Sequence, residues 1–164
     1  MVPEIVASFD RSLAYIRELV ADLTDEEMVM QPPGVPNHGA WTLGHIIFSC
    51  EQIAQLLGVE PWLPADWEAR FGYGSTPGPQ ALAASGKSGA LAAFADAGQH
   101  LRAALLGIDE SNLYRPLPDE QARAILPTVA DALVQIVAAH TAFHAGQLAA
   151  WRRAIGRRPV GVFI

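Results

Sequence analysis

The chain has 164 residues, of which 51% are hydrophobic and 17% are charged, and its formal net charge is −6 at pH 7. This composition excludes intrinsic disorder, and the length predicts one domain over residues 1–164. The acidic balance argues against a nucleic-acid-binding protein, because phosphate binding depends on a concentrated basic surface.

The sequence also predicts a cytoplasmic protein with no membrane partner. No apolar run reaches the roughly 18 to 20 residues needed to cross a bilayer. Glu4 and Asp10 stand where a secretory signal would need a basic start and an apolar stretch. The single cysteine, Cys50, cannot form an internal disulfide and falls in an apolar helical pattern, as expected of a buried thiol in a reducing compartment.

Two helices are expected in the first part of the chain. Apolar residues at spacings of three and four form a stripe along residues 3–23, which predicts an amphipathic helix. Residues 31–40 contain three prolines and two glycines, which predicts a loop. A second helix is then expected from about Ala40 to Gly58.

A long connection, residues 59–88, follows the second helix. Regular structure is broken by Pro61, Pro64, Pro77 and Pro79, and cover is required for Trp62, Trp67, Phe71 and Tyr73. We expect a packed loop with one helical turn near Asp66 to Arg70. Long connections of this kind are often functional, so this one could cover a pocket; aromatic plugging of the core, or a dimer contact, is the alternative.

The second part of the chain predicts two more helices. One has Ser88 as its N-cap and ends near Gly107, and the other runs from Thr128 to Ile155 and stops at Gly156. No alternation typical of strands competes with these helices. The sequence therefore predicts an all-α protein, a four-helix bundle with long connections.

Two histidines lie on the apolar face of the last predicted helix. His140 and His144 are four residues apart, one helical turn, so both imidazoles can reach one point beside the helix. Burying them costs free energy unless their nitrogens find partners, and a metal ion is one such partner. Hydrogen bonds to nearby backbone carbonyls are the alternative.

A third histidine, His45, lies on the second predicted helix, which is apolar on two sides. It shares one stripe with Trp41, Phe48, Gln52 and Leu56. A pair of ligands from one helix and a third from a neighbour is a common way to build a metal site in a bundle. Three neutral imidazoles suit Zn, Ni, Fe or Co and leave a coordination position open. Three unrelated core histidines would be the structural alternative.

Other polar residues carry less weight. His38 lies in the proline-rich loop, where it could cap the second helix, bond a neighbour or stand at a pocket rim, and His100 falls off the apolar stripe of its helix. Glu51 lies off the stripe of His45, so no general base is identified. The cluster of Arg152, Arg153, Arg157 and Arg158 is expected to complement the carbonyls at the end of its helix.

Two segments of the sequence resemble the DinB-like (DinB/YfiT) superfamily. They are NHGAWTLGHIIF at 37–48 and HTAFHAGQLAAWRRAIGRRP at 140–159. Members of that superfamily pair a histidine on the second helix with an H-x-x-x-H-x-x-Q motif on the last. The resemblance implies that His45, His140 and His144 are metal ligands, that the metal is a divalent ion such as Zn or Ni, that the bundle has up-down-down-up topology, and that the protein forms a homodimer.

The resemblance leaves the reaction on a small-molecule substrate open. It is compatible with an S-transferase or isomerase that uses a low-molecular-weight thiol, and with a metal-dependent hydrolase. A metal-loaded binding or interaction module without catalysis is a third reading. Gln147, one turn beyond His144, could orient a bound water or substrate, or could make a hydrogen bond that packs two helices.

Overall fold

The computed structural model describes residues 1–78 and 86–161. Within these two ranges every regular element is a helix, and the only strand-type pairing there is an isolated bridge between Pro116 and Thr128. The expectation of an all-α protein is confirmed for this part of the chain. None of the helices described is both long and apolar enough to cross a membrane.

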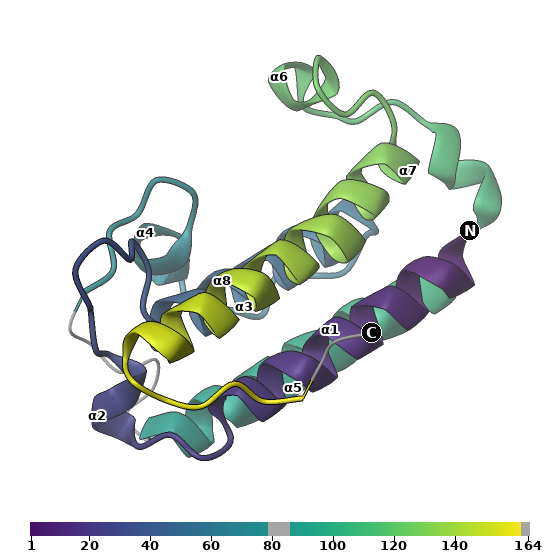
Figure 1. The fold of residues 1–164 in the computed structure, drawn as a ribbon. Coiled ribbons are helices and arrows are strands. Elements are labelled where there is room, and N and C mark those ends of the chain that lie inside the picture. Colours follow the sequence, from purple (N-terminus) through teal and green to yellow (C-terminus); the bar gives the residue numbers. More distant parts are fainter. Residues whose placement is uncertain (79–85, 162–164) are drawn as a thin grey trace.

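The long helices are α1 (Val2–Val20), α3 (Gly39–Leu56), α5 (Gly86–Leu106) and α8 (Thr141–Ala154). Shorter helical segments connect or extend them: α2 (Asp25–Met28), α4 (Trp67–Phe71), the 3-10 turn η1 (Glu110–Tyr114), α6 (Glu120–Arg123), α7 (Val129–Ala132) and the π-helical segment η2 (Leu133–His140). Figure 1 shows that α7, η2 and α8 form one continuous rod. This rod corresponds to the fourth predicted helix.

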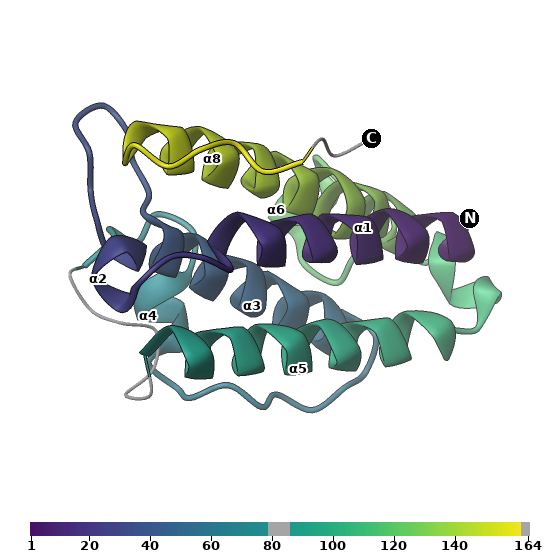
Figure 2. The same ribbon diagram turned by 60° about the horizontal axis from the view of Figure 1, so that its bottom comes forward.

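Hydrogen bonds between helix ends fix the directions of the long helices. Lys87, at the start of α5, donates its ammonium to carbonyls at and just beyond the end of α1, including that of Ala21 at 2.9 Å. Arg152, in the last turn of α8, donates to the Leu19 carbonyl of α1 at 2.8 Å. Arg115, soon after α5, donates to the Leu56 carbonyl that ends α3, at 2.7 Å. Helices α1 and α8 therefore end where α5 begins, and α3 and α5 end at the opposite side (Figures 1 and 2).

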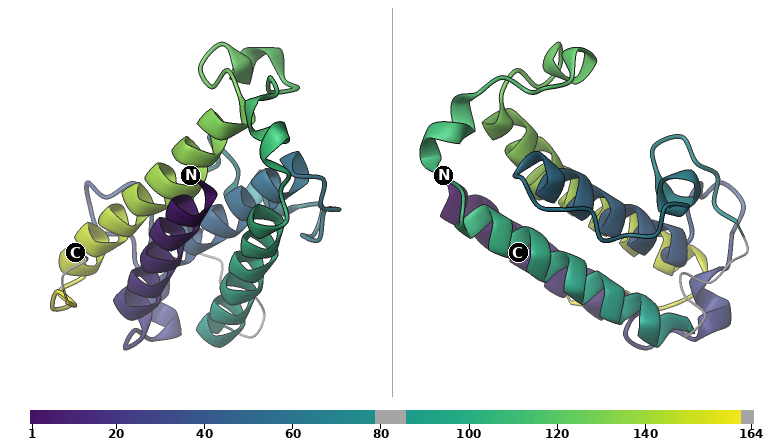
Figure 3. Two further views of the ribbon diagram at one scale, coloured as in Figure 1. Left: turned by 90° about the vertical axis from the view of Figure 1, so that its right-hand side faces the viewer. Right: turned by 180° about the vertical axis from the view of Figure 1, so that it is seen from behind.

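The core lies between these four rods. Helix α3 packs against α5 and α8, and α1 packs against α5, η2 and α8 (Figure 3). The largest fully buried side chains come from all of them and include Phe9, Ile16, Leu43, Phe94, Leu133 and Trp151. This arrangement places α3 beside the rod that carries His140 and His144, as the metal-site hypothesis requires.

Two local predictions need correction, those for Ser88 and Tyr73. Ser88 lies inside α5 and is not its N-cap; Asp25 of α2 instead accepts the Lys87 backbone N–H at 2.8 Å. Tyr73, expected to need cover, is fully exposed at 102%. Pro79 lies outside the described residues. The helical turn expected near Asp66 to Arg70 is present as α4.

Candidate metal centre

The side chain of His45 is held from two sides. Its ring stacks on Trp41, one turn earlier on α3, with centroids 4.8 Å apart and planes 8° from parallel. Its Nδ1–H donates to the Phe71 carbonyl at 2.7 Å. Because the proton sits on Nδ1, Nε2 presents a lone pair to the space between α3 and α8, the tautomer that a metal ligand needs.

Phe71 reaches His45 because a glycine precedes the histidine. A Cβ on Gly44 would lie 2.4 Å from Cδ1 of Phe71, so only glycine allows the ring of α4 to pack this closely on α3. The neighbouring Trp67 also anchors α4, since its indole N–H donates to the Gly44 carbonyl at 3.1 Å. The packing of α4 on α3 thus sets the position of the Phe71 carbonyl.

His140 and His144 lie on the rod at the junction between η2 and α8. His140 is the last residue of the π-helical segment, and His144 lies one turn into α8. Such π-helical insertions often occur at functional sites, because they rotate the side chains that follow. His144 is buried and His140 is partly exposed, and their rings meet edge to face with centroids 4.4 Å apart.

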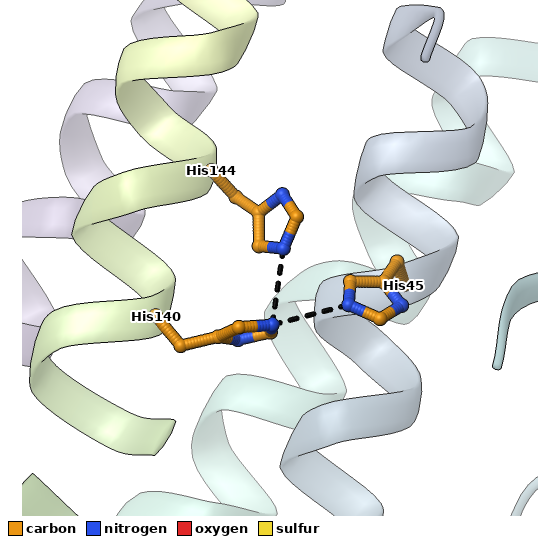
Figure 4. Close-up of side chains that lie close together, drawn as sticks. All are labelled: His45, His140 and His144. Carbon is orange, nitrogen blue, oxygen red and sulfur yellow. Dashed lines mark hydrogen bonds between the residues drawn. The ribbon is translucent and has the colours of Figure 1, made fainter. Parts of the chain in front are cut away.

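The three imidazoles converge through their Nε2 atoms (Figure 4). Nε2 of His140 lies 3.1 Å from Nε2 of His45 and 3.0 Å from Nε2 of His144. Three nitrogens bound to one ion at about 2.0–2.1 Å would be roughly 2.9 to 3.4 Å apart for bond angles between 90° and 109°. The two spacings from His140 therefore match those of ligands to a single metal ion, and the ligand nitrogens of all three histidines lie within 4.8 Å of one another.

Hydrogen bonds among the three rings cannot satisfy them. A proton on Nε2 of His140 can be donated to only one of the two neighbouring rings. Nε2 of the other ring would then face His140 without a hydrogen bond. In the part of the chain that the structure describes, Nδ1 of His140 and Nδ1 of His144 are buried and have no hydrogen-bond partner. A bound cation would give all three Nε2 atoms a partner, so these residues fit a divalent metal and could hold one.

The electrostatics keep the triad neutral, which is the form that binds metal. Burial lowers the pKa of His45. Burial, together with repulsion from neighbouring imidazoles, lowers the pKa of His140 to about 4 and that of His144 to about 3. At neutral pH a cation at this site would therefore compete with few protons.

Gln147 lies one turn beyond His144, where its amide raises the pKa of that imidazole. Its Oε1 is buried and, like His144 Nδ1, has no hydrogen-bond partner among the described residues. An amide oxygen beside a ring N–H is a complementary pair. Neither role predicted for Gln147, orientation of a bound water or substrate or a hydrogen bond between helices, is tested by this position.

A pocket of about 600 Å³ opens beside the triad. Its lining is Trp41, His45, Phe48, Ser49, Gln52, Ile53, Tyr73, Gly74, Ser75, Ile136, His140, Phe143 and His144. Of the residues predicted to share the stripe of His45, Trp41, Phe48 and Gln52 line the pocket and Leu56 does not. The long connection contributes Tyr73 to Ser75, while its Trp67 and Phe71 are buried in the core. Both expected roles of the connection, pocket cover and core plug, are thus present.

The other polar residues considered in the sequence do not line this pocket. His38 caps α3: its Nδ1 accepts from the Trp41 N–H at 3.1 Å and its Nε2–H donates to Gly78 at 2.8 Å. His100 is exposed, as expected, and its ring lies edge-on to Trp62. Buried Glu51 accepts the backbone N–H groups of Trp62 and Leu63, which leaves it outside the pocket. Cys50 is buried, and burial raises its pKa to about 12.

The arginine cluster does not serve mainly the end of its own helix. Arg152 is 3% exposed and forms a bidentate pair with Asp22, whose pKa it lowers to about 2. Arg157 pairs with Glu27 at 2.6 and 2.7 Å. These pairs connect the last turn of α8 and the segment after it to the link that follows α1 and to α2. No sequence pattern indicated these partners, which lie 130 residues away in the chain.

Comparison with known proteins supports these assignments at the level of family and fold. A sequence model of the DinB superfamily matches residues 8–148, a range that includes all three histidines. The crystal structure of a conserved protein from Enterococcus faecalis is similar, with a TM-score of 0.77 and 20% identity over 94% of this chain and 96% of that chain. At this identity the likeness concerns the fold. No protein with a curated description matches the chain.

Proposed function

This chain belongs to the DinB superfamily, and we propose that it is a divalent-metal enzyme of the thiol-dependent S-transferase or isomerase type, acting on a small molecule. His45, His140 and His144 hold the ion, with Zn or Ni as the metal. The observation that carries the proposal is the convergence of three neutral imidazoles at the wall of a pocket, where Nε2 of His140 lies 3.1 Å from that of His45 and 3.0 Å from that of His144.

The fold proposed for this function is the up-down-down-up four-helix bundle. Its four rods are α1, α3, α5 and the α7–η2–α8 unit, and the hydrogen bonds between helix ends support these directions. We also propose a homodimer, which light scattering of the purified full chain tests.

Three imidazoles leave room on the ion for one more ligand on the side of the pocket. A divalent ion there would supply a Lewis acid at which a thiol loses its proton and becomes a nucleophile. The chain's own residues supply the rest: the Phe71 carbonyl orients His45, and the apolar side chains that line the pocket would contact the body of the substrate. The thiol sulfur would then form a bond to an electrophilic carbon of the substrate while the bond from that carbon to its leaving group breaks, and the leaving group departs with the electron pair.

The lining of the pocket favours the thiol route over hydrolysis. Activation of water benefits from a carboxylate positioned as general base. Among the described residues that line the pocket there is no aspartate or glutamate, and buried Glu51 is bonded to backbone N–H groups elsewhere. A thiol needs no such base, because its proton leaves to solvent at a lower pKa than that of water.

Turnover assays separate the three readings. Metal-loaded protein is incubated with a panel of electrophiles, with and without a low-molecular-weight thiol, alongside His144→Ala as a site-disrupted control. The proposal expects conjugation or isomerisation that requires both thiol and intact triad. Turnover with water alone would favour the hydrolase, and specific ligand binding without turnover would favour a binding module.

A further inference from the structure

The walls of the pocket beside the triad are apolar and carry no formal charge. Trp41, Phe48, Ile53, Ile136 and Phe143 supply most of the side-chain surface. Among its described lining residues there is no lysine, arginine, aspartate or glutamate. Away from the ion that the triad would hold, a ligand carboxylate packed against these walls would lack an ion-pair partner, which is costly in an apolar environment.

The polar groups of the pocket are few and mostly engaged. The Ser49 hydroxyl donates to the His45 carbonyl at 2.9 Å, and the Ser75 hydroxyl accepts from the Trp41 indole N–H at 3.0 Å. Gln52 is exposed. The basic groups of the C-terminal part, Arg152 and Arg157, are paired with acidic residues of α2 and the α1–α2 link. No built site for an anionic group faces the triad within the described residues.

Aromatic rings flank the triad directly. Trp41 stacks on the His45 ring, and Phe143 meets the edge of the His144 ring at 5.6 Å. Phe143 is 62% exposed and Tyr73 fully exposed, so both rings would lose accessible surface against a ligand body. A volume of about 600 Å³ lies within the roughly 300–1,000 Å³ range of small-molecule sites.

We infer that the ligand of this pocket is an uncharged molecule whose apolar, ring-sized body is attached close to the atom that binds the metal. The inference rests on the proposed metal site and specifies its substrate class. It implies that a thiol whose carboxylate lies too far from the sulfur to reach the ion, and therefore lies against these walls, is a poor ligand. A neutral thiol or an aromatic electrophile matches the walls.

The test compares two small thiols on the full chain loaded with Co²⁺. Phenylmethanethiol and 4-(mercaptomethyl)benzoate carry the same ring, but only the second carries a carboxylate, at the far end of the ring where it cannot reach the ion. Each forms a sulfur-to-cobalt charge-transfer absorption when it binds. We expect phenylmethanethiol to bind at least about tenfold more tightly, because an unpaired carboxylate against apolar walls costs more than the ~1.4 kcal/mol of a tenfold change in affinity. Phe143→Ala should weaken the binding of phenylmethanethiol.

A matched pair of lysine variants tests the missing charge. Gln52 and Gln55 are both exposed residues of α3, but only Gln52 lines the pocket. Gln52→Lys should tighten binding of 4-(mercaptomethyl)benzoate several-fold, and Gln55→Lys should leave it unchanged. Equal or tighter binding of 4-(mercaptomethyl)benzoate than of phenylmethanethiol to the wild type, or absence of thiol binding to cobalt-loaded protein, overturns the inference. Failure to take up Co²⁺ would instead overturn the proposed metal site.

Discussion

Gly44→Ala should weaken metal binding without altering any ligand. The added methyl group would lie 2.4 to 2.6 Å from three atoms of the Phe71 ring, so that ring must move. The Phe71 carbonyl, which accepts the His45 Nδ1–H at 2.7 Å, moves with it. The imidazole then loses the hydrogen bond that sets its tautomer and orientation.

The expected magnitude follows from two effects. Loss of a hydrogen bond to a metal-ligating histidine lowers metal affinity by about 10- to 100-fold, or roughly 1.4 to 2.7 kcal/mol. Overpacking of a tight contact destabilises the metal-free fold by about 1 to 3 kcal/mol. Both are measurable on one protein, by competition with a chromophoric chelator and by denaturant unfolding of the metal-free form.

Gly146→Ala is the matched control. Gly146 is also a helical glycine close to a ligand, two residues after His144, but a Cβ there would meet nothing within 4 Å. This variant should bind metal like the wild type and be more stable by about 0.5 to 1 kcal/mol, since alanine favours the helix. If Gly44→Ala bound metal as tightly as Gly146→Ala, the role assigned to the Phe71 carbonyl would be wrong.

Three further predictions concern the triad's protonation, the arginine anchor and the thiol. The pKa values of His140 and His144 in the folded protein lie below the value near 6.5 of an unfolded chain. The metal-free protein should therefore be most stable above pH 6.5 and lose stability as the pH drops toward 4. The expected loss between pH 7 and 5 is about 1 to 2 kcal/mol for each histidine. Denaturant unfolding across this range checks it, and a flat profile contradicts it. Arg152→Ala should cost about 1 to 3 kcal/mol, because it removes charge-assisted hydrogen bonds to half-exposed Asp22 and the bond to the Leu19 carbonyl, yet leave metal stoichiometry intact in the folded fraction; an unchanged melting temperature would refute the anchor. Cys50 should resist alkylation in the native protein and react after unfolding, as mass spectrometry with iodoacetamide can show.

Apolar periodicity predicted the long helices well, because each buries one face against the others. The predicted ranges 3–23 and Thr128–Ile155 correspond to α1 and to the α7–η2–α8 rod. The helix ends were less predictable where a partner distant in sequence supplies the cap. Asp25 provides one at the start of α5, and no local pattern reveals that contact.

The meeting of the triad could be predicted from spacing, but its support could not. One-turn spacing brings His140 and His144 together, and the two apolar faces of α3 indicated that His45 is covered. The Phe71 carbonyl is a backbone group 26 residues away from His45. No side-chain pattern in the sequence reveals a contact with a backbone group. The small residue at Gly44 was the only available sign of a close approach. The π-helical segment was also not foreseen, since apolar periodicity does not distinguish it from an α-helix over one or two turns.

The most direct test of the central claim is elemental analysis of the protein purified without added metal. We predict about one divalent ion per chain in the wild type and in His100→Ala, whose exposed imidazole lies outside the triad. His45→Ala and His144→Ala, still folded by circular dichroism, should each lose most of the ion. Equal metal content in all four proteins, or none in the wild type even after reconstitution, would contradict a single ion held by three imidazoles.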